Sequence, residues 1–334
     1  MTPPNSAPKQ VVFHIGHMKT ATTLLQEDVF PRIENTAFYC YPSGFPQRCS
    51  ELRLHPDGTA LTRLASEMRS WIVQSPAPLQ LFSWEGLLGD YLHNYRGRST
   101  MMDVIRAVSA DATILIVTRR QADLVNSLYK QALHRGHSPS IANFTNWDGT
   151  ALKEFRPGAP ANIEVDALNF DRTARTFEDE FGPENVHIIA YEWLRQDPER
   201  FYTTLEECFG QNVPRARVGR SSNVGYKSRA ARIARILNPL FRSPGTEAGI
   251  LPYRPFDSAI ARTKRGTMSR RLLSAINSLL DPRFYLQNRL VETVGGSSDL
   301  LTPAIREAIG EKCAASNQAL DTRRGLGLRD LGYW

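Results

Sequence analysis

The sequence predicts an α/β protein whose central parallel sheet is flanked by helices. Three observations support this fold class. Short runs of β-branched and apolar residues alternate with longer stretches of helical periodicity. Several of the runs are continuously apolar, as strands of a parallel sheet are when both faces are buried. Polar or charged residues follow the runs directly, at the sheet edge where ligands collect in this type of protein.

Four strands are predicted in chain order. The first is Val11–Ile15, which ends at Gly16. The other three are the apolar runs Leu79–Trp84, Ala112–Thr118 and Val186–Tyr191. The polar residues that follow these three runs are Glu85, Arg119 and Glu192. Because the carboxyl ends of parallel strands lie at one edge of a sheet, we expect these residues and the first glycine to lie near one another.

Helical periodicity fills the intervals between the strands. It predicts a helix after Thr20 that is closed by Pro31, and further helices over 60–73, 101–108, 123–134, 166–181 and 302–320. We interpret residues 1–334 as a single domain. Within it we expect a flexible N-terminus over 1–8, a polar loop or lid over 138–163, and a variable, partly helical region over 215–300 that covers the ligands.

The composition fits a globular protein with an anionic ligand. Hydrophobic residues make up 41% of the chain and charged residues 22%, and the net charge is +7. The cysteines have no metal-ligand spacing, so we expect free thiols and no metal, although Cys40 and Cys49 are near enough in sequence to bridge. Since no signal-like or membrane-spanning apolar run occurs, we expect a cytoplasmic protein without a transmembrane segment.

A phosphate-binding loop is predicted at Gly16–Thr23, between a strand and a helix, which is the usual setting of a P-loop. The first amides of a helix are unpaired and its macrodipole is positive there, so this position attracts anions. Lys19 adds an ammonium group, and hydroxyl groups come from Thr20, Thr22 and Thr23. The spacing from the glycine to the lysine is too short for the ATP and GTP pattern G-x-x-x-x-G-K-[ST].

The loop resembles the 5′-phosphosulfate loop of sulfotransferases, which commonly reads as a strand, then P-K-[ST]-G-T-[TS], then a helix. Met18 and Ala21 depart from that pattern, because Pro and Gly are usual at these positions. Ala21 suits the loop if it is helical, whereas a backbone with φ > 0 favours glycine. The resemblance implies that the sulfuryl donor is bound by Gly16, Lys19, Thr20, Ala21, Thr22 and Thr23.

A second element extends the resemblance. Sulfotransferases hold the 3′-phosphate of the donor with an Arg at a strand end and a Ser eight residues later on the following helix. Arg119 ends a predicted strand here, and Ser127 lies eight residues further on. An arginine presents a planar fork of donors that matches a phosphate. Tyr191 begins a segment, Tyr191–Leu194, that is similar to the family's segment after the fourth strand, and we include it among the donor-binding residues.

The resemblance implies the sulfotransferase fold, in its bacterial, glycan-acting branch, with 3′-phosphoadenosine 5′-phosphosulfate (PAPS) as donor. The implied reaction passes a sulfuryl group to a hydroxyl or amine of an acceptor, which we expect to be a glycan or glycolipid and not a nucleic acid. Lys19 is suited to stabilise the charge that develops on the leaving phosphate oxygen. Acceptor deprotonation needs a base, for which Glu85 is the first candidate and His17 the second.

Two other functions fit parts of the sequence. One is a nucleotide kinase or NTPase on a related P-loop fold, against which the lysine spacing counts. The other is a non-catalytic protein that binds polyanions through its positive charge. Two basic segments, 215–229 and 262–266, are alternative candidates for covering the donor.

Overall fold

The computed structural model describes residues 9–40, 42, 44–158, 161–217, 226–242, 249–252, 267–280 and 295–334. The chain divides into two compact units. The first lies within residues 1–124, 165–220 and 309–334, and the second within 125–164 and 221–308. The interpretation of the whole chain as one domain stays a prediction.

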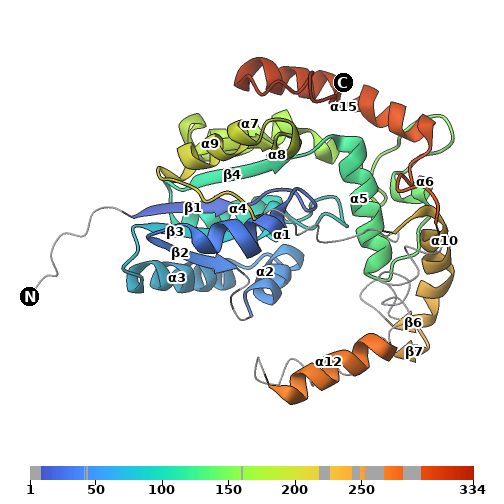
Figure 1. Cartoon of the computed structure of the whole chain (residues 1–334), viewed down its shortest axis with the longest axis horizontal. Coiled ribbons are helices and arrows are strands. Elements are labelled where there is room, and N and C mark those ends of the chain that lie inside the picture. The colour runs from blue at the N-terminus through green and yellow to red at the C-terminus, as the bar shows by residue number, and fades with distance from the viewer. Residues whose placement is uncertain are drawn as a thin grey trace, which may run out of the picture. The chain divides into compact units, whose positions relative to one another are not determined.

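A five-stranded parallel sheet forms the centre of the first unit (Figure 1). Its strand order is β2-β3-β1-β4-β5. The strands are β1 (Gln10–His14), β2 (Thr36–Cys40), β3 (Leu79–Ser83), β4 (Thr113–Thr118) and β5 (Val186–Ala190). The predicted α/β class with a parallel sheet is confirmed. Because β1 is central, the loop that follows it lies between the ends of β3 and β4.

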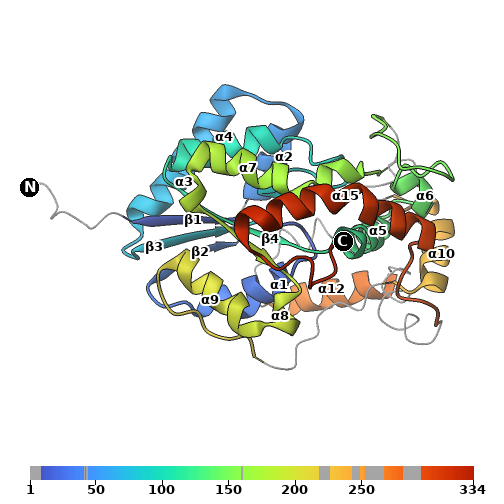
Figure 2. The ribbon, with the colours of Figure 1, turned by 90° about the horizontal axis from the view of Figure 1, so that it is seen from above.

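Helices cover both faces of this sheet (Figure 2): α3, α4 and α7 lie on one face, and α1, α8 and α9 on the other. Every residue of β3 and β4 is buried between these layers. The helical elements of the first unit are α1 (Thr22–Leu24), η1 (Leu25–Val29), η2 (Phe30–Arg32), α2 (Phe45–Leu54), α3 (Gly58–Gln74), η3 (Glu85–Leu88), α4 (Arg98–Val108), η4 (Val165–Leu168), α7 (Phe170–Phe181), η5 (Pro183–Asn185), α8 (Trp193–Gln196) and α9 (Pro198–Phe209).

The four predicted strands are present with every end within one residue of the prediction, but β2 was not predicted. Its five residues, Thr36–Cys40, are all partly exposed, so it lacks the buried apolar run that marks the other strands. The predicted helix closed by Pro31 also differs in detail. It is a continuous segment in which a short α-turn changes to a π-helix at Leu25 and to a 3₁₀ turn at Phe30. Pro31 therefore lies inside the last turn and does not follow it.

The second unit contains the later part of α5 (Gln121–His134), α6 (Ile141–Phe144), α10 (Ser228–Leu237), η6 (Asn238–Leu240), α12 (Met268–Leu280) and a two-stranded sheet of β6 (Phe241–Arg242) and β7 (Leu251–Pro252). Buried Asn238 ties α5 to η6, because its Nδ2 donates to the carbonyl oxygens of Leu133 (2.8 Å) and His137 (2.7 Å). The segment 138–163 has little regular structure apart from α6 in the residues described, and its role as a lid stays a prediction.

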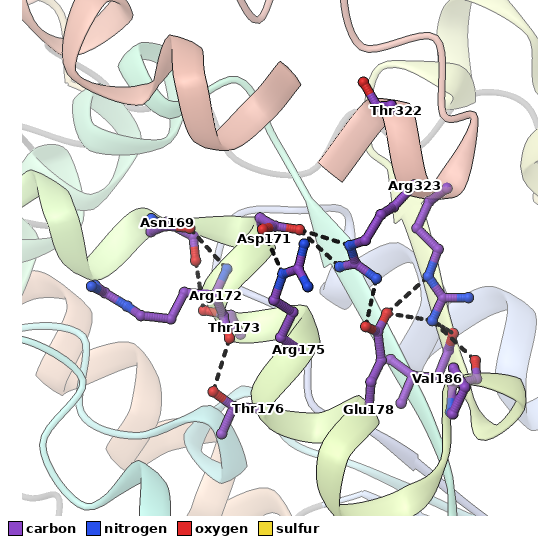
Figure 3. Close-up of polar contacts among 12 residues, drawn as sticks. Asn169, Asp171, Arg172, Thr173, Arg175, Thr176, Glu178, Val186, Thr322 and Arg323 are labelled. Carbon is purple, nitrogen blue, oxygen red and sulfur yellow. Dashed lines mark hydrogen bonds and ion pairs between the residues drawn. The ribbon is translucent and has the colours of Figure 1, made fainter. Parts of the chain in front are cut away.

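The C-terminal helix α15 (Pro303–Arg324) is fixed to α7 by an ion cluster, drawn in Figure 3. Arg323 pairs with both Asp171 (2.8 Å) and Glu178 (2.6 Å). Arg324 also pairs with Glu178, and Arg175 pairs with Asp171 at 2.9 Å. Both carboxylates are largely buried, so these partners are needed to offset the cost of removing the charges from water. The cluster fixes the end of α15, from which the last residues of the chain continue.

The four cysteines are all free thiols, as predicted. In the part of the chain that the structure describes, no helix combines the length and hydropathy that crossing a membrane requires.

Candidate functional site

The carboxyl edge of the sheet carries the residues that the sequence predicted there. Gly16 lies two residues beyond β1, and Glu85 lies two residues beyond β3. Arg119 follows β4 directly, and Glu192 lies two residues beyond β5. Since β3 and β4 flank β1, Glu85 and Arg119 lie on opposite sides of the loop that begins at Gly16.

The start of the loop extends the sheet along β4. The N–H group of Ile15 donates to the Leu115 carbonyl (3.0 Å), and that of His17 donates to the Val117 carbonyl (3.4 Å). Gly16 has little room for a side chain, because a Cβ there would be 3.1 Å from the Val117 nitrogen. The glycine therefore lets the loop backbone approach the strand closely.

Two loop residues with side chains have left-handed backbones. Lys19 has φ 67°, and Ala21 has φ 64° and ψ 12° at the position that precedes α1. Each such residue costs about 1–2 kcal/mol relative to a right-handed backbone. Of the two alternatives for Ala21, the structure shows the one that favours glycine.

We expect the variant Ala21→Gly to be more stable than the wild type by about 0.5–1 kcal/mol. Glycine removes the left-handed strain of about 1–2 kcal/mol from the folded state. It also gives the unfolded chain more conformational entropy, which lowers the stability by about 0.4–1 kcal/mol. Urea unfolding at neutral pH measures the difference. The control is Ala65→Gly, a buried position in α3, which should destabilise the protein. A destabilisation of similar size at both positions would contradict the left-handed conformation of Ala21.

The loop threonines have different environments. Thr20 is fully buried, and its hydroxyl donates to the His17 carbonyl, which closes the loop on itself. Thr22 is 2% exposed, and its Oγ1 has no hydrogen-bond partner within the described residues. Thr23 is exposed at the start of the helical segment. A buried hydroxyl without a partner is unfavourable, so Thr22 is suited to pair with a bound oxyanion.

Arg119 connects the two predicted donor motifs. Its Nη1 donates to the carbonyl oxygen of Lys19 at 2.8 Å. Its guanidinium lies 4.7 Å from the ring centroid of Tyr191, a favourable cation–π distance. The buried Nε of Arg119 has no partner within the described residues. The structure therefore brings together Lys19, Arg119 and Tyr191, which come from the ends of β1, β4 and β5.

The remaining predictions about donor binding concern Ser127 and the two basic segments. Ser127 lies on α5, partly exposed, in the second unit, and its action together with Arg119 stays a prediction. Of the two basic segments, 262–266 lies wholly outside the described residues, as does 218–225 within the first.

Glu85 begins η3 directly after Trp84 and is partly exposed. Burial, together with the negative charges of Glu85 and Glu27, raises the pKa of the Cys40 thiol to about 11. The Glu85 carboxylate therefore lies near the end of β2. Sequence reasoning did not connect Cys40 or Glu27 with this position, because it missed that strand.

His17 belongs to the loop and is 1% exposed. Its Nδ1 forms a hydrogen bond with the hydroxyl of Tyr95 at 2.8 Å, and its ring packs against Phe170 at 4.9 Å. Burial, with a smaller effect of the Arg98 charge, lowers the pKa of His17 to about 3. Protonation is unfavourable in this environment, which makes His17 a weaker candidate base than Glu85.

Sequence reasoning also missed the residues that hold His17. Tyr95 is 78 residues away along the chain. It lies in a turn in which Asn94 (φ 56°) and Tyr95 (φ 54°) both have left-handed backbones. The guanidinium of the partly buried Arg98 lies 5.0 Å from the Tyr95 ring centroid and donates to Thr173. No spacing pattern in the sequence relates these residues to the loop.

We expect the protein to lose stability in mild acid because of two buried histidines. Burial lowers the pKa of His14 to about 3, as it does for His17. Below the ordinary value of 6.5, the unfolded chain binds protons at these rings that the folded chain does not. Stability is therefore complete above that value and falls as the pH decreases toward 3, by roughly 2 kcal/mol for each histidine at pH 5.

Urea unfolding at pH 7.5 and pH 5 measures this loss. Between pH 7.5 and pH 5, the free energy of unfolding should fall less in the variant His17→Asn than in the wild type. The matched control is His55→Asn, which changes an exposed histidine and should leave the loss unchanged. An equal loss in the wild type and in His17→Asn would contradict the assignment.

Within the described residues, no group of three or more His, Cys, Asp or Glu side chains is placed to hold a metal ion. Comparisons with protein-family models and with curated proteins found no match.

Comparison with solved structures found similar chains, among them three sulfotransferases. One is the sulfotransferase from Alicyclobacillus acidocaldarius, with 15% identity and a TM-score of 0.41 over 65% of this chain and 88% of that chain. Another is the sulfotransferase domain of the Synechococcus PCC 7002 olefin synthase, with 15% identity and a TM-score of 0.34 over 64% of this chain and 77% of that chain. The third is the sulfotransferase domain of the curacin biosynthetic pathway, with 14% identity and a TM-score of 0.31 over 62% of this chain and 75% of that chain.

Proposed function

We propose that this chain is a sulfotransferase that transfers a sulfuryl group from PAPS to an acceptor hydroxyl or amine. The observation that carries the proposal is the hydrogen bond from Arg119 to the Lys19 carbonyl. It joins the backbone of the P-loop lysine to the guanidinium of an arginine at the neighbouring strand end, so two motifs that each carry a cationic group lie next to each other. A donor with a 5′-phosphosulfate and a 3′-phosphate needs two such groups.

The residues of this site fit that donor. The buried hydroxyl of Thr22 and the buried Nε of Arg119 have no partner within the described residues, and both are donors that phosphate oxygens accept from. Lys19 and the first amides of the helical segment are assigned to the 5′-phosphosulfate. Arg119 and Ser127 are assigned to the 3′-phosphate, with Tyr191 holding the guanidinium in place.

In the proposed reaction, an acceptor oxygen or nitrogen forms a bond to sulfur while the bond from sulfur to the 5′-phosphate oxygen breaks. Adenosine 3′,5′-bisphosphate is the product that leaves. Lys19 stabilises the negative charge that develops on the departing phosphate oxygen. Glu85, on the other side of the loop, takes the proton of the acceptor. The charges balance, because the proton removed from the acceptor remains on the carboxylate until solvent takes it.

We assign the acceptor to the carbohydrate class. Glu85 is partly exposed at the end of β3, and Glu27 is exposed nearby. Carboxylates are good acceptors for the many hydroxyl donors of a sugar. A panel of mono- and polysaccharides, glycolipids, simple alcohols and phenols, incubated with PAPS labelled in its sulfuryl group, tests the function and the acceptor class together. Release of adenosine 3′,5′-bisphosphate with labelled product is expected for the sugars.

Binding measurements discriminate the two other functions. A nucleotide kinase or NTPase would bind ATP with Mg²⁺ more tightly than adenosine 3′,5′-bisphosphate. A polyanion-binding protein would bind acidic glycans in a salt-dependent way that Lys19→Ala and Arg119→Ala do not change. Either result would overturn the proposal.

We expect Arg119→Ala to weaken the binding of adenosine 3′,5′-bisphosphate about 10- to 100-fold, because a charge-assisted hydrogen bond contributes about 1.5–3 kcal/mol. The affinity for adenosine 5′-monophosphate, which lacks the 3′-phosphate, should change much less. Isothermal titration calorimetry measures both. Arg106→Ala is the control, because Arg106 is an exposed arginine on α4 that pairs with Glu180. Equal weakening of both nucleotides by Arg119→Ala would contradict the 3′-phosphate assignment.

A further inference from the structure

The penultimate residue of the chain lies at the carboxyl edge of the sheet. Tyr333 is 3% exposed, and its hydroxyl donates to Oε2 of Glu192 at 2.8 Å. The same hydroxyl lies 3.4 Å from Oγ1 of Thr118, the last residue of β4. The tail therefore contacts the ends of β4 and β5, next to Arg119.

Glu192 also binds the turn between β4 and α5. Its Oε1 accepts a hydrogen bond from the backbone N–H of Arg120 at 3.1 Å, and the Arg120 side chain lies 3.6 Å away. Glu192 is 6% exposed, so its carboxylate depends on these donors. Removing one donor from a buried carboxylate is costly, and the remaining groups move to compensate.

The tail reaches this position through two further contacts. Asn317 on α15 donates to the Tyr333 carbonyl at 3.1 Å and forms a reciprocal pair of hydrogen bonds with Gln121, the first residue of α5, at 2.6 and 3.0 Å. Gly332 has φ 76°, a left-handed backbone that favours glycine, and it lies beside the Arg120 guanidinium. With the ion cluster of Figure 3 at the end of α15, these contacts leave the tail one well-defined path.

We propose that Tyr333 is a positioning residue for the 3′-phosphate of the donor. Tyr333 and Glu192 hold the two neighbours of Arg119, since Tyr333 contacts the side chain of Thr118 and Glu192 binds the backbone N–H of Arg120. The direction of the Arg119 guanidinium depends on that backbone. A guanidinium recognises a phosphate through a planar fork that tolerates little misplacement. The C-terminal tail is thus part of the donor site, although it does not touch the donor. This inference rests on the proposed function.

The test compares two nucleotides on the wild type and on Tyr333→Phe. Phenylalanine keeps the ring contact with Phe170, whose centroid is 6.4 Å away, and removes only the hydroxyl. Calorimetry gives the affinities for adenosine 3′,5′-bisphosphate and for adenosine 5′-monophosphate. We expect the preference for the bisphosphate to fall roughly tenfold in Tyr333→Phe, with the monophosphate affinity unchanged. Trp334→Ala, at the neighbouring exposed residue, is the control and should keep the wild-type preference.

Each outcome decides the proposal. An unchanged preference in Tyr333→Phe, or equal weakening of both nucleotides, would overturn it, because a merely structural hydroxyl would not act on the 3′-phosphate selectively. If Tyr333→Phe does not fold, Glu192→Gln is measured in its place, and it should reduce the same preference. The wild-type measurement separates this inference from the proposed function. A wild type that does not prefer the bisphosphate would reject the function itself, whereas a preference that Tyr333→Phe keeps would reject only the positioning role.

Discussion

Replacing Lys19 with alanine is expected to lower the turnover number for sulfuryl transfer at least 100- to 1,000-fold. Removing a preorganised donor from the developing charge of a transition state has an effect of this size. The donor should still bind, because Arg119 contacts the backbone carbonyl of Lys19, which the variant retains. A turnover assay with labelled PAPS and calorimetry with adenosine 3′,5′-bisphosphate measure the two effects separately.

The matched control is Lys153→Ala. Lys153 is an exposed lysine paired with Asp148 at 2.9 Å, and its removal should leave turnover unchanged. If Lys19→Ala retained turnover within a few-fold of the wild type, Lys19 would have no role in the chemical step. If it lost nucleotide binding and turnover in the same proportion, Lys19 would contribute to ground-state binding alone.

The local pattern of the sequence predicted four strands of the five-stranded sheet and the position of the loop between a strand and a helix, because these depend on neighbouring residues. β4 is a largely apolar run followed by arginine, and two residues after β1 comes a glycine that has to approach a neighbouring backbone closely. The meeting of Lys19 and Arg119 also followed from chain order, since parallel strands end at one edge. The contact between their motifs, which are 100 residues apart, is the structural consequence.

What the sequence did not predict depends on long-range packing. Tyr333 and Glu192 are 141 residues apart, and neither lies in a motif that requires the other. The burial of His17 is likewise determined by Tyr95 and Phe170, which approach from other parts of the first unit. Ala21 is a third case, because its left-handed backbone is imposed by the loop against its own preference. Single-sequence patterns carry little information on such contacts.

Glu85→Gln is expected to lower turnover about 100- to 10,000-fold, the range for loss of a general base. Glutamine keeps the shape and one carbonyl oxygen but does not accept a proton at neutral pH. The affinity for adenosine 3′,5′-bisphosphate should remain that of the wild type, because Glu85 follows β3 and Arg119 follows β4, on opposite sides of β1. Initial rates with a saturating sugar acceptor, together with calorimetry, measure both quantities.

Glu34→Gln is the control, because Glu34 is an exposed carboxylate that precedes β2 and so lies at the opposite end of that strand from Cys40. It should retain most of the turnover. Undiminished turnover in Glu85→Gln would remove Glu85 from the mechanism and leave His17 as the remaining candidate base. The turnover of the variant His17→Asn would then show whether His17 takes the proton of the acceptor. A buried ring that is hard to protonate is expected to affect stability in acid more than turnover at neutral pH, so a large loss of turnover in a stably folded His17→Asn would assign the proton transfer to His17 instead.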